Sequence, residues 1–358
     1  MDGTRFRPRV TRGHSDVEAS TVYSRRRIIP GRPRTLGRIL GPASAALLLI
    51  GSTPGHAQES AAVIRHTFES THMGTTFRIV AYSENADVAR AAAAQAFGHV
   101  ARLDSLFSDY RPDSEVTRLT QQATIDRYVP VSTELWSILL EANQWSDRTS
   151  GLFDVTIGPL SRLWRWSARR AELPDPGRIR HAREAVGFQG LIVDAHEPQV
   201  KLTRAGMALD LGGIAKGFAA DAMLNILARH GIDAALVDAG GDIAAGAPPP
   251  RSDGWLVALP DGDSLRIAHS AVATSGDVER HVIVNGVRYA HIVDPRTGLG
   301  VIRAQTVTVG APTATSADVL ASVLSIMDAP SGHALIQRTE GAWARTYDPE
   351  QQTRPFQR

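Results

Sequence analysis

The chain has 358 residues, 43% hydrophobic and 21% charged, which excludes wholesale disorder and is enough for one large core or two ordinary ones. It has no cysteine, which excludes disulfides, thiolate metal sites, a cysteine nucleophile and a lipid-bearing cysteine anchor. The net charge of +2 is unevenly divided: residues 1–57 carry ten arginines against three carboxylates, so residues 58–358 have a net charge of −5 and no broad nucleic-acid surface is expected.

Residues 1–57 have the layout of a secretory leader. Arginine-rich residues precede a short apolar stretch over 39–50, and a small-residue segment ends at Ala57. The apolar stretch is shorter than a membrane span needs, so we expect cleavage after Ala57 and export to the periplasm. An uncleaved anchor is the alternative. The cluster of arginines at 25–27 suggests twin-arginine export, but it lies well before the apolar stretch, so the choice between the Sec and Tat routes stays open.

Hydrophobic periodicity predicts helices and strands throughout residues 58–358, without an internal repeat or a dividing linker. Helices are expected over 87–106, 133–150, 174–187, within 209–230 and over 315–327. Strands are expected over 75–82, 190–194, 234–238, 255–259, 264–269, 272–275 and 305–309, with a hairpin over 281–293 that turns at Asn285 and Gly286. Because helices alternate with runs of antiparallel strands, we predict an α+β or mixed α/β fold.

The segment richest in chemistry is 209–217, which reads LDLGGIAKG and opens a helix. Its two adjacent glycines allow a ligand to approach the backbone, and the start of a helix offers free N–H groups to an anion. Lys216 is one of only two lysines in a chain that otherwise uses arginine for positive charge. The segment therefore suggests phosphate binding; a glycine-rich turn with a solvated lysine is the alternative, and the spacing is not that of a P-loop.

The helix over 315–327 places Asp318, Ser322 and Ser325 on one face. Asp318 and Ser322 stand four residues apart, so their oxygens can converge. A carboxylate and a hydroxyl are hard ligands that suit magnesium better than zinc. The alternative is an ordinary amphipathic helix with a polar surface stripe.

Two other segments combine a polar side chain with a tight turn. The segment 289–298 reads YAHIVDPRTG, where His291 can act as a general base and the residues after it form a turn. The alternative is a tight turn beside an ordinary histidine. In 150–160, Asp154 stands in an apolar loop, so its carboxylate either braces the loop through backbone N–H groups or meets a polar ligand. Met73 and Tyr110 can pack on a flat aromatic ligand or simply in the core.

Taken together, these segments resemble the ApbE family of flavin transferases. The matching pieces, in chain order, are 73–75, 107–114, 151–160, 210–217, 240–242, 274–276, 291–298 and 318–322. The resemblance implies a single compact α+β domain over 58–358 with two lobes, similar to T-fold proteins, with mixed or antiparallel sheets and flanking helices. It implies transfer of FMN from FAD to a threonine or serine of an exported redox protein, with magnesium as cofactor and AMP as leaving group.

The resemblance also assigns residues. It implies that FAD is contacted by Met73, Tyr110, Leu152, Phe153, Asp154, Asp210, Lys216 and Val293. It implies that magnesium is bound by Asp318, the Ser322 hydroxyl and the carbonyl of Gly213, and that His291 is the base, in a loop shaped by Asp294 and Thr297.

Two departures from the family pattern matter. Ser322 stands where the family usually has threonine, which keeps the oxygen and loses the methyl group that restricts the rotamer. No lipid-anchoring cysteine follows the leader, so we expect a soluble exported enzyme without a stable membrane span after leader removal. Two other functions stay open: a magnesium-dependent FAD pyrophosphatase that releases FMN and AMP, and a flavin-binding protein without turnover.

Overall fold

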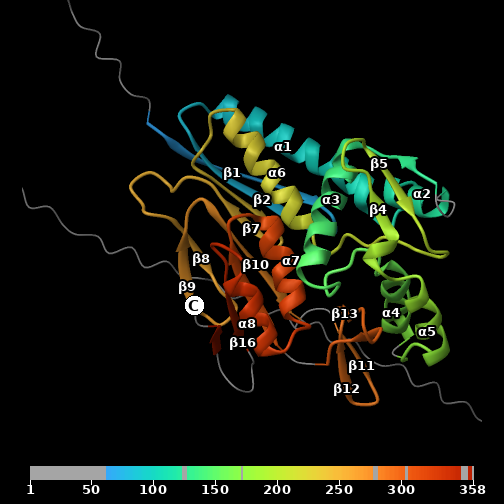
Figure 1. Cartoon of the computed structure of the whole chain (residues 1–358). Coiled ribbons are helices and arrows are strands. Elements are labelled where there is room, and N and C mark those ends of the chain that lie inside the picture. Colours follow the sequence, from blue (N-terminus) through green and yellow to red (C-terminus); the bar gives the residue numbers. More distant parts are fainter. Residues whose placement is uncertain are drawn as a thin grey trace, which may run out of the picture. The chain divides into compact units, whose positions relative to one another are not determined.

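The computed structural model describes residues 62–122, 127–170, 172–276, 281–302 and 305–347, and the backbone of 354–356. Residues Glu59–Arg358 form a compact unit, shown in Figure 1. The leader predicted over 1–57 lies outside the described residues. Within the described part of the chain, no helix is both long and apolar enough to cross a bilayer.

The centre of this unit is an antiparallel sheet, which in the described residues has eight strands in the order β1-β2-β6-β7-β10-β15-β16-β17. The strands are β1 (Ile64–His72), β2 (Thr75–Ser83), β6 (Ala235–Ala239), β7 (Ile243–Ala245), β10 (Ser270–Gly276), β15 (Thr306–Ala311), β16 (Trp343–Tyr347) and β17 (Arg354–Phe356). Helices and antiparallel strands together confirm the α+β prediction.

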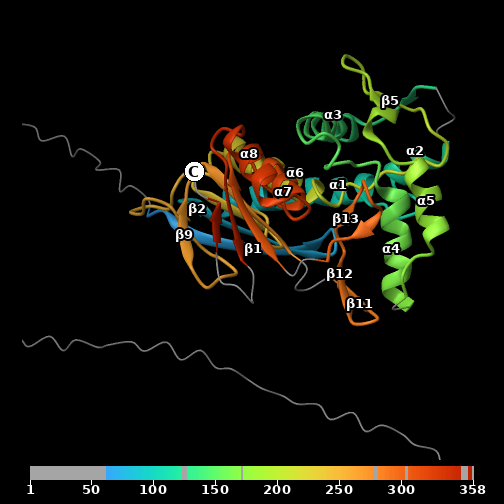
Figure 2. The same ribbon diagram turned by 60° about the horizontal axis from the view of Figure 1, so that its bottom comes forward.

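Both faces of the sheet are covered. Successive residues of a strand point to opposite sides, so neighbouring residues join different apolar clusters. Ile79 joins the largest apolar cluster, while its neighbour Val80 joins a smaller cluster on the other face. Four helices pack on the first face: α1 (Ala86–Phe107), α6 (Ala215–Arg229), α7 (Ala314–Leu324) and α8 (Ala329–Gln337). The hairpin of β8 (Trp255–Ala258) and β9 (Ser264–Ile267) packs on the second face (Figure 2).

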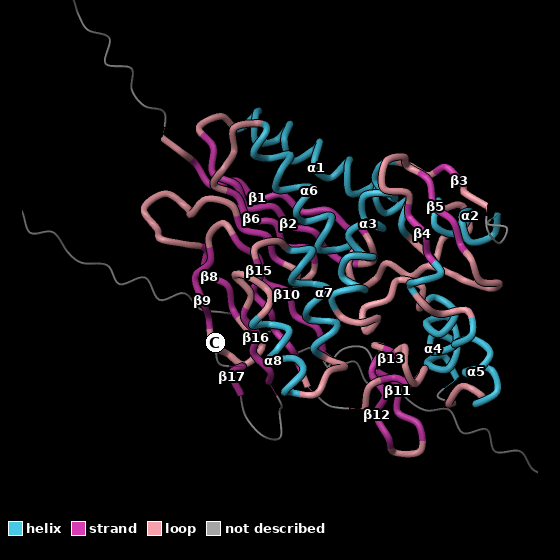
Figure 3. The backbone as a smooth tube through the Cα atoms, viewed as in Figure 1, coloured by secondary structure: helices cyan, strands magenta, loops and turns pink. Residues whose placement is uncertain are grey.

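A second group of elements extends the large cluster beyond the sheet (Figure 3). It consists of α2 (Glu115–Gln122), α3 (Thr133–Arg148) and a small sheet of β3 (Val129–Pro130), β5 (Gln199–Leu202) and β4 (Leu191–Val193), the last preceded by the 3₁₀ turn η1 (Phe188–Gly190). We call these elements, the eight-stranded sheet and its covering helices and hairpin the main lobe.

The remaining elements form a small lobe with an apolar cluster of its own, which includes Leu160, Trp164 and Val293. The small lobe consists of α4 (Gly158–Arg170), α5 (Pro176–Glu184), the hairpin of β11 (His281–Val284) and β12 (Val287–Ala290), and the paired short strands β13 (Val293–Asp294) and β14 (Leu299–Gly300). Two cores within one unit agree with the two-lobed domain that the family resemblance implies.

Hydrogen bonds to α6 help to position the start of α7. Thr313 caps α7 through a bond from the Ser316 N–H, and the Asp221 carboxylate of α6 accepts bonds of 2.8 Å from the N–H groups of Ala314 and Thr315. Gly217 allows the two helices to cross closely, because a Cβ there would lie 2.6 Å from the Ala314 carbonyl carbon.

The strand predicted over 75–82 is confirmed as β2, and the structure adds β1, which was not predicted and pairs with it throughout. One local prediction needs correction. The second strand of the hairpin was expected to reach Val293, but β12 ends at Ala290. There the chain bonds instead to Val301, which accepts from the Ala290 N–H over 2.7 Å and donates to the Ile292 carbonyl over 2.9 Å.

Candidate functional site

The predicted magnesium ligands come together where α6 crosses α7. Asp318 is buried, and its Oδ2 accepts a 3.2 Å hydrogen bond from the Gly217 N–H at the start of α6. A Cβ built on Gly213 would lie 3.3 Å from Ser322 Oγ and 3.5 Å from the Phe153 ring. Gly213 therefore lies beside Ser322, one helical turn from Asp318 on α7, although 105 positions separate Gly213 from Asp318 in the sequence.

The helix face that carries Asp318 is not a solvated polar stripe. Asp318 is 6% exposed and Ser325 is 3% exposed. Ser325 satisfies its hydroxyl within the helix by donating to the Ala321 carbonyl over 2.9 Å. Burial raises the pKa of Asp318, opposed by the charge of Lys216 and the N–H of Gly217. A carboxylate held in this environment is stabilised by a nearby cation.

Lys216 supplies a cation near Asp318, and it forms an ion pair with Asp242. Asp242 follows the turn between β6 and β7 and is only 2% exposed. Burial and the negative charge of Asp318 raise the pKa of Asp242 to about 7, while Lys216 acts in the opposite direction. The site therefore holds two buried carboxyl groups and one ammonium, a balance that a bound anion or cation would change.

Asp242 was not among the predicted site residues. It stood in the quoted motif 240–242, but a Gly-Gly-Asp turn gives no indication of what its carboxylate meets. The turn requires its glycines, because Gly240 and Gly241 have φ angles of +70° and +101°. Gly240 also packs directly against Thr75, so this turn lies beside the β1–β2 turn that carries Met73. Met73 itself has a φ of +49° and is half-buried against the large cluster.

Asp154 has the bracing role that the sequence left open as one alternative. Its Oδ1 accepts from the N–H and hydroxyl of Thr156 over 2.8 and 2.7 Å, and its Oδ2 accepts from the Phe188 N–H over 2.9 Å. Burial raises the pKa of Asp154, and these bonds lower it in part. The brace holds the loop in which Leu152 is half-buried and Phe153 is packed toward Gly213.

Tyr110 and Asp210 are brought together by Arg165, which was not predicted as a site residue. The Arg165 guanidinium lies 4.3 Å from the Tyr110 ring centroid and 3.4 Å from Asp210 Oδ2, and it forms an ion pair with Asp109. Tyr110 is 73% exposed, so its other ring face is open to solvent. Asp210 Oδ1 accepts a 2.9 Å bond from the Gly212 N–H, which shapes the loop before α6.

Asp109 and Arg165 come from segments that are 56 positions apart. Burial raises the pKa of Asp109, with Arg165 opposing. No periodicity relates such distant residues, so the sequence contained no signal for this ion pair.

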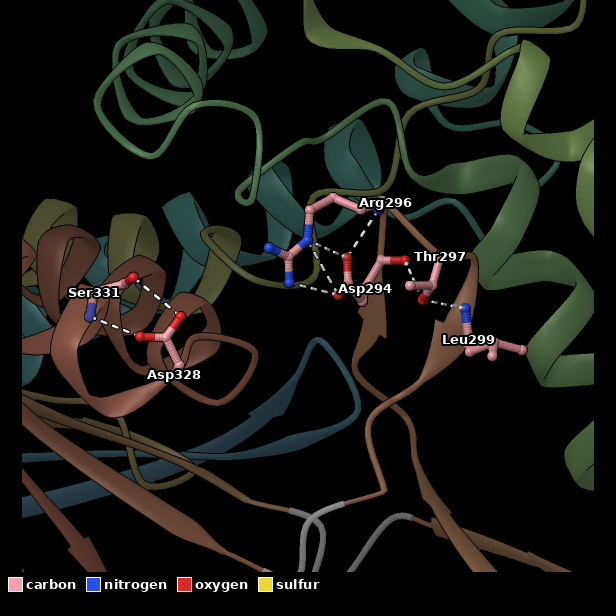
Figure 4. A network of polar contacts seen from close by, with 6 residues as sticks. All are labelled: Asp294, Arg296, Thr297, Leu299, Asp328 and Ser331. Carbon is pink, nitrogen blue, oxygen red and sulfur yellow. Dashed lines mark hydrogen bonds and ion pairs between the residues drawn. The ribbon is translucent and has the colours of Figure 1, made fainter.

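His291, Val293 and Asp294 lie in the small lobe. His291 is exposed and stands between β12 and β13, and Val293 is buried in the small-lobe cluster. Figure 4 shows the Asp294 carboxylate held by Arg296, over 2.8 Å from Nη2, and the Thr297 hydroxyl accepting from the Leu299 N–H over 3.2 Å. Burial alone would raise the pKa of Asp294, but the bonds from Arg296 outweigh it and lower the pKa.

This turn is attached firmly to the helices of the small lobe. Trp164 of α4 donates from its indole N–H to the Gly298 carbonyl over 2.9 Å. Gly298 has a φ of +75°, and a Cβ there would lie 2.6 Å from the Ile179 side chain of α5. The segment after His291 is therefore fixed to α4 and α5 rather than free to rearrange.

The donor set determines which metal could bind. Within the described residues, no three His, Asp or Glu side chains converge as an all-protein metal cage would require. Gly213, Asp318 and Ser322 would instead supply one backbone carbonyl, one carboxylate and one hydroxyl, respectively. This is the pattern expected for magnesium, which binds proteins through one or two carboxylates and takes further ligands from substrate phosphates and water.

Comparisons with known proteins identify the family of the chain. The sequence model of the ApbE family matches residues 73–345. A Treponema pallidum protein named FAD:protein FMN transferase is 31% identical, over 88% of this chain and 92% of its own. A Vibrio cholerae protein of the same name is 30% identical, over 75% of this chain and 83% of its own.

Solved structures give the same result. The ApbE protein of Thermotoga maritima superimposes with a TM-score of 0.73 and 29% identity, covering 82% of this chain and 97% of its own. The apo flavinyl transferase ApbE of Pseudomonas stutzeri gives a TM-score of 0.72 and 27% identity, covering 81% and 93%. The range matched by the family model, 73–345, includes the elements of the small lobe and every site segment described above from Met73 to Ser322. This chain belongs to the ApbE family.

Proposed function

We propose that this protein is an FAD:protein FMN transferase. Membership of the ApbE family and relatives of that name over most of the chain support the proposal. The observation that carries it is the crossing of α6 and α7, where the Asp318 carboxylate, the Ser322 hydroxyl and Gly213 meet beside Lys216. An ammonium and hard oxygen ligands in one place suit a diphosphate bridge.

In the proposed reaction, a threonine or serine hydroxyl of an acceptor redox protein attacks the FMN phosphorus of FAD. A bond forms between the hydroxyl oxygen and this phosphorus, and the bond from the phosphorus to the bridging oxygen breaks, so that AMP leaves. His291 accepts the hydroxyl proton. Lys216 binds the phosphate oxygens as charge redistributes.

Magnesium fits this site because its expected ligands are all oxygens and Asp318 is a buried carboxylate. Asp318, Ser322 and the Gly213 carbonyl would hold it. When bound, it would supply charge neutralisation at the pyrophosphate oxygens. The isoalloxazine and adenosine parts of FAD are proposed to contact Met73, Tyr110, Leu152, Phe153, Asp210 and Val293. Asp154 takes part by holding Phe153 in place, and any direct contact with FAD remains a prediction.

The test is incubation of the protein with FAD, Mg²⁺ and a candidate acceptor, followed by mass spectrometry of the acceptor and measurement of AMP. The expected result is an acceptor heavier by FMN less one water, with one AMP released for each adduct. Free FMN and AMP without an adduct, across several acceptors, would identify a pyrophosphatase. FAD binding without AMP release would identify a flavin-binding protein.

We further propose that residues 1–57 direct export to the periplasm. The arginine-rich start, the short apolar stretch and Ala57 support it. Fusion of these residues to a reporter that is active only outside the cytoplasm tests the proposal, and N-terminal sequencing of the exported product tests cleavage after Ala57. A reporter that stays in the cytoplasm would contradict export.

A further inference from the structure

Helices α4 and α5 concentrate positive charge that the composition does not reveal. Over 158–184 the sequence has seven arginines and three carboxylates, a net charge of +4, although residues 58–358 together have a net charge of −5. Arg165 is engaged by Asp109 and Asp210. The other six arginines are exposed, and none forms an ion pair within the described part of the chain: Arg162, Arg169, Arg170, Arg178, Arg180 and Arg183.

Like charges on neighbouring helices repel one another, and the three carboxylates of this segment, Glu172, Asp175 and Glu184, offset fewer than half of its seven arginines. An aromatic ring stands among them. The guanidinium carbons of Arg170 and Arg178 lie 4.6 and 5.4 Å from the ring of Trp166. These stacking contacts hold the two guanidinium groups on the surface without neutralising their charge.

Exposed aliphatic side chains accompany the arginines. Leu173, between α4 and α5, is 41% exposed, and Ile283 and Val287, on either side of the β11–β12 turn, are 57% and 42% exposed. The α4–α5 connection and the β11–β12 turn project from the same side of the small lobe in Figures 1 and 2. Both belong to elements packed on the small-lobe cluster, so their relative position is fixed.

We propose that this face of the small lobe, formed by the α4–α5 arginines with Leu173, Ile283 and Val287, binds the surface of an anionic phospholipid bilayer. Lipid phosphates would complement the unpaired arginines. The side chains of Leu173, Ile283 and Val287 would insert at the boundary between headgroups and acyl chains. An acidic protein would match the charges. It would not offer the continuous apolar layer that could bury aliphatic side chains at both the α4–α5 connection and the β11–β12 turn.

The proposal goes beyond the flavin-transfer reaction and does not depend on it. The same helices hold the turn that follows His291, through the bond of Trp164 to Gly298. Attachment at this face would therefore hold that turn near the bilayer, where a membrane-bound acceptor is accessible.

The experiment measures binding to lipid vesicles. Residues Glu59–Arg358 form a compact unit, and all its apolar clusters lie within that range, so the assay uses this unit and excludes the ten arginines of the leader. Co-sedimentation is compared for vesicles of equal phosphatidylglycerol and phosphatidylcholine and for vesicles of phosphatidylcholine alone. Binding is expected only to the anionic vesicles, and it should weaken at least tenfold between about 0.05 M and about 0.5 M salt.

Matched variants test the location. The triple variant Arg169→Gln, Arg170→Gln, Arg178→Gln should bind about 100-fold more weakly, since each arginine near an anionic surface contributes roughly fivefold. The control variant Arg65→Gln, Arg229→Gln, Arg251→Gln removes the same charge from exposed arginines elsewhere and should change binding less than about threefold. The variant Ile283→Ser, Val287→Ser should bind about tenfold more weakly at both salt concentrations.

Several outcomes would overturn the proposal. Absence of binding to the anionic vesicles at low salt would do so, and so would an equal loss in the two triple variants. The protein could instead fail to bind vesicles and bind polyglutamate through Arg169, Arg170 and Arg178. In that case the face is a docking surface for an acidic protein and the lipid proposal is wrong. Thermal unfolding of each variant verifies that it is folded.

Discussion

The backbone N–H of Gly217 donates a hydrogen bond to the buried carboxylate of Asp318 over 3.2 Å, joining the first turn of α6 to the middle of α7. The bond requires a close approach of the helices. A Cβ on Gly217 would lie 2.6 Å from the Ala314 carbonyl carbon and 2.8 Å from Thr315 Cα. The glycine that looks like part of a phosphate-binding sequence therefore also permits the packing that positions Asp318.

Replacing Gly217 with alanine should separate α6 from α7. We expect the free energy of unfolding to fall by about 1–3 kcal/mol, as for other overpacked sites, and magnesium affinity to fall with it. Urea unfolding and magnesium titration check this. Gly98→Ala is the matched control, because Gly98 is an exposed residue of α1 with nothing within 4 Å of its Cβ position. It should stabilise the protein by about 0.5–1 kcal/mol, so equal effects of the two substitutions would contradict the prediction.

Asp318→Asn should abolish most transfer activity while leaving the fold intact. Burial raises the pKa of Asp318, which indicates that a neutral side chain is tolerated there. We expect the transfer rate to fall by at least about 10²-fold, because a preorganised charge at the reacting phosphate is lost. Calorimetric titration of magnesium in the presence of FAD should show the same loss of affinity. Transfer at the normal rate would disprove the metal assignment.

Two substitutions at Ser322 separate the contribution of its oxygen to magnesium binding from that of its side-chain shape. Ser322→Ala removes the predicted ligand oxygen and should weaken magnesium binding by about tenfold. Ser322→Thr keeps the oxygen and adds a methyl group that restricts the rotamer, so it should bind magnesium at least as well as the natural chain. If alanine and threonine behave alike, the hydroxyl is not a ligand.

His291→Ala should uncouple FAD binding from transfer. His291 is exposed in the small lobe, so its loss should leave stability and FAD affinity nearly unchanged. The transfer rate should fall by about 10²–10⁴-fold, the usual contribution of a general base. FAD fluorescence titration and single-turnover transfer measure the two quantities separately. Full activity would remove His291 from the mechanism.

Arg165→Gln should leave the buried carboxyl group of Asp109 without its partner. The Asp109 side chain is only 6% exposed, so we expect a loss of about 2–3 kcal/mol in the free energy of unfolding. FAD affinity should also fall, since Tyr110 loses the cation stacked on its ring. Tyr110→Phe keeps the ring and should bind FAD normally. Equal FAD affinity in Arg165→Gln and the natural chain would show that this arginine does not position Tyr110.

Glu141 in α3 predicts a pH dependence of stability. Burial, with the negative charge of Asp221, raises its pKa from 4.5 to about 7. Because the folded-state pKa is higher than the unfolded one, this contribution is complete below about pH 4.5 and is lost as the pH rises through about 7. Glutamine mimics the protonated side chain, so Glu141→Gln should be more stable than the natural chain by about 1–2 kcal/mol at pH 8, allowing for partial exposure. Urea unfolding should show little difference at pH 4.5; an equal difference at both pH values would contradict the assignment.

The sequence by itself determined the elements whose signals are local. The alanine-rich helix α1 lies within one residue of the ends predicted over 87–106, and the Asn85 side chain caps it. The turn at Asn285 and Gly286 formed where the dipeptide predicted it, because a type I′ turn needs residues that tolerate positive φ. By contrast, α4 was not predicted, because tryptophans and arginines interrupt its apolar positions, and its buried residues Leu160 and Trp164 pack in the small-lobe cluster with residues distant in the chain.

The tertiary structure alone decided the partners of the charged side chains. The sequence placed Asp318 and Ser322 on one helix face, since residues four apart on a helix are always neighbours. It contained nothing that paired Lys216 with Asp242 or Arg165 with Asp109, because those contacts depend on how helices and turns distant in the chain pack together. Spacing within one element is set by backbone geometry, whereas contact between elements is set by burial, and only the folded chain has buried surfaces.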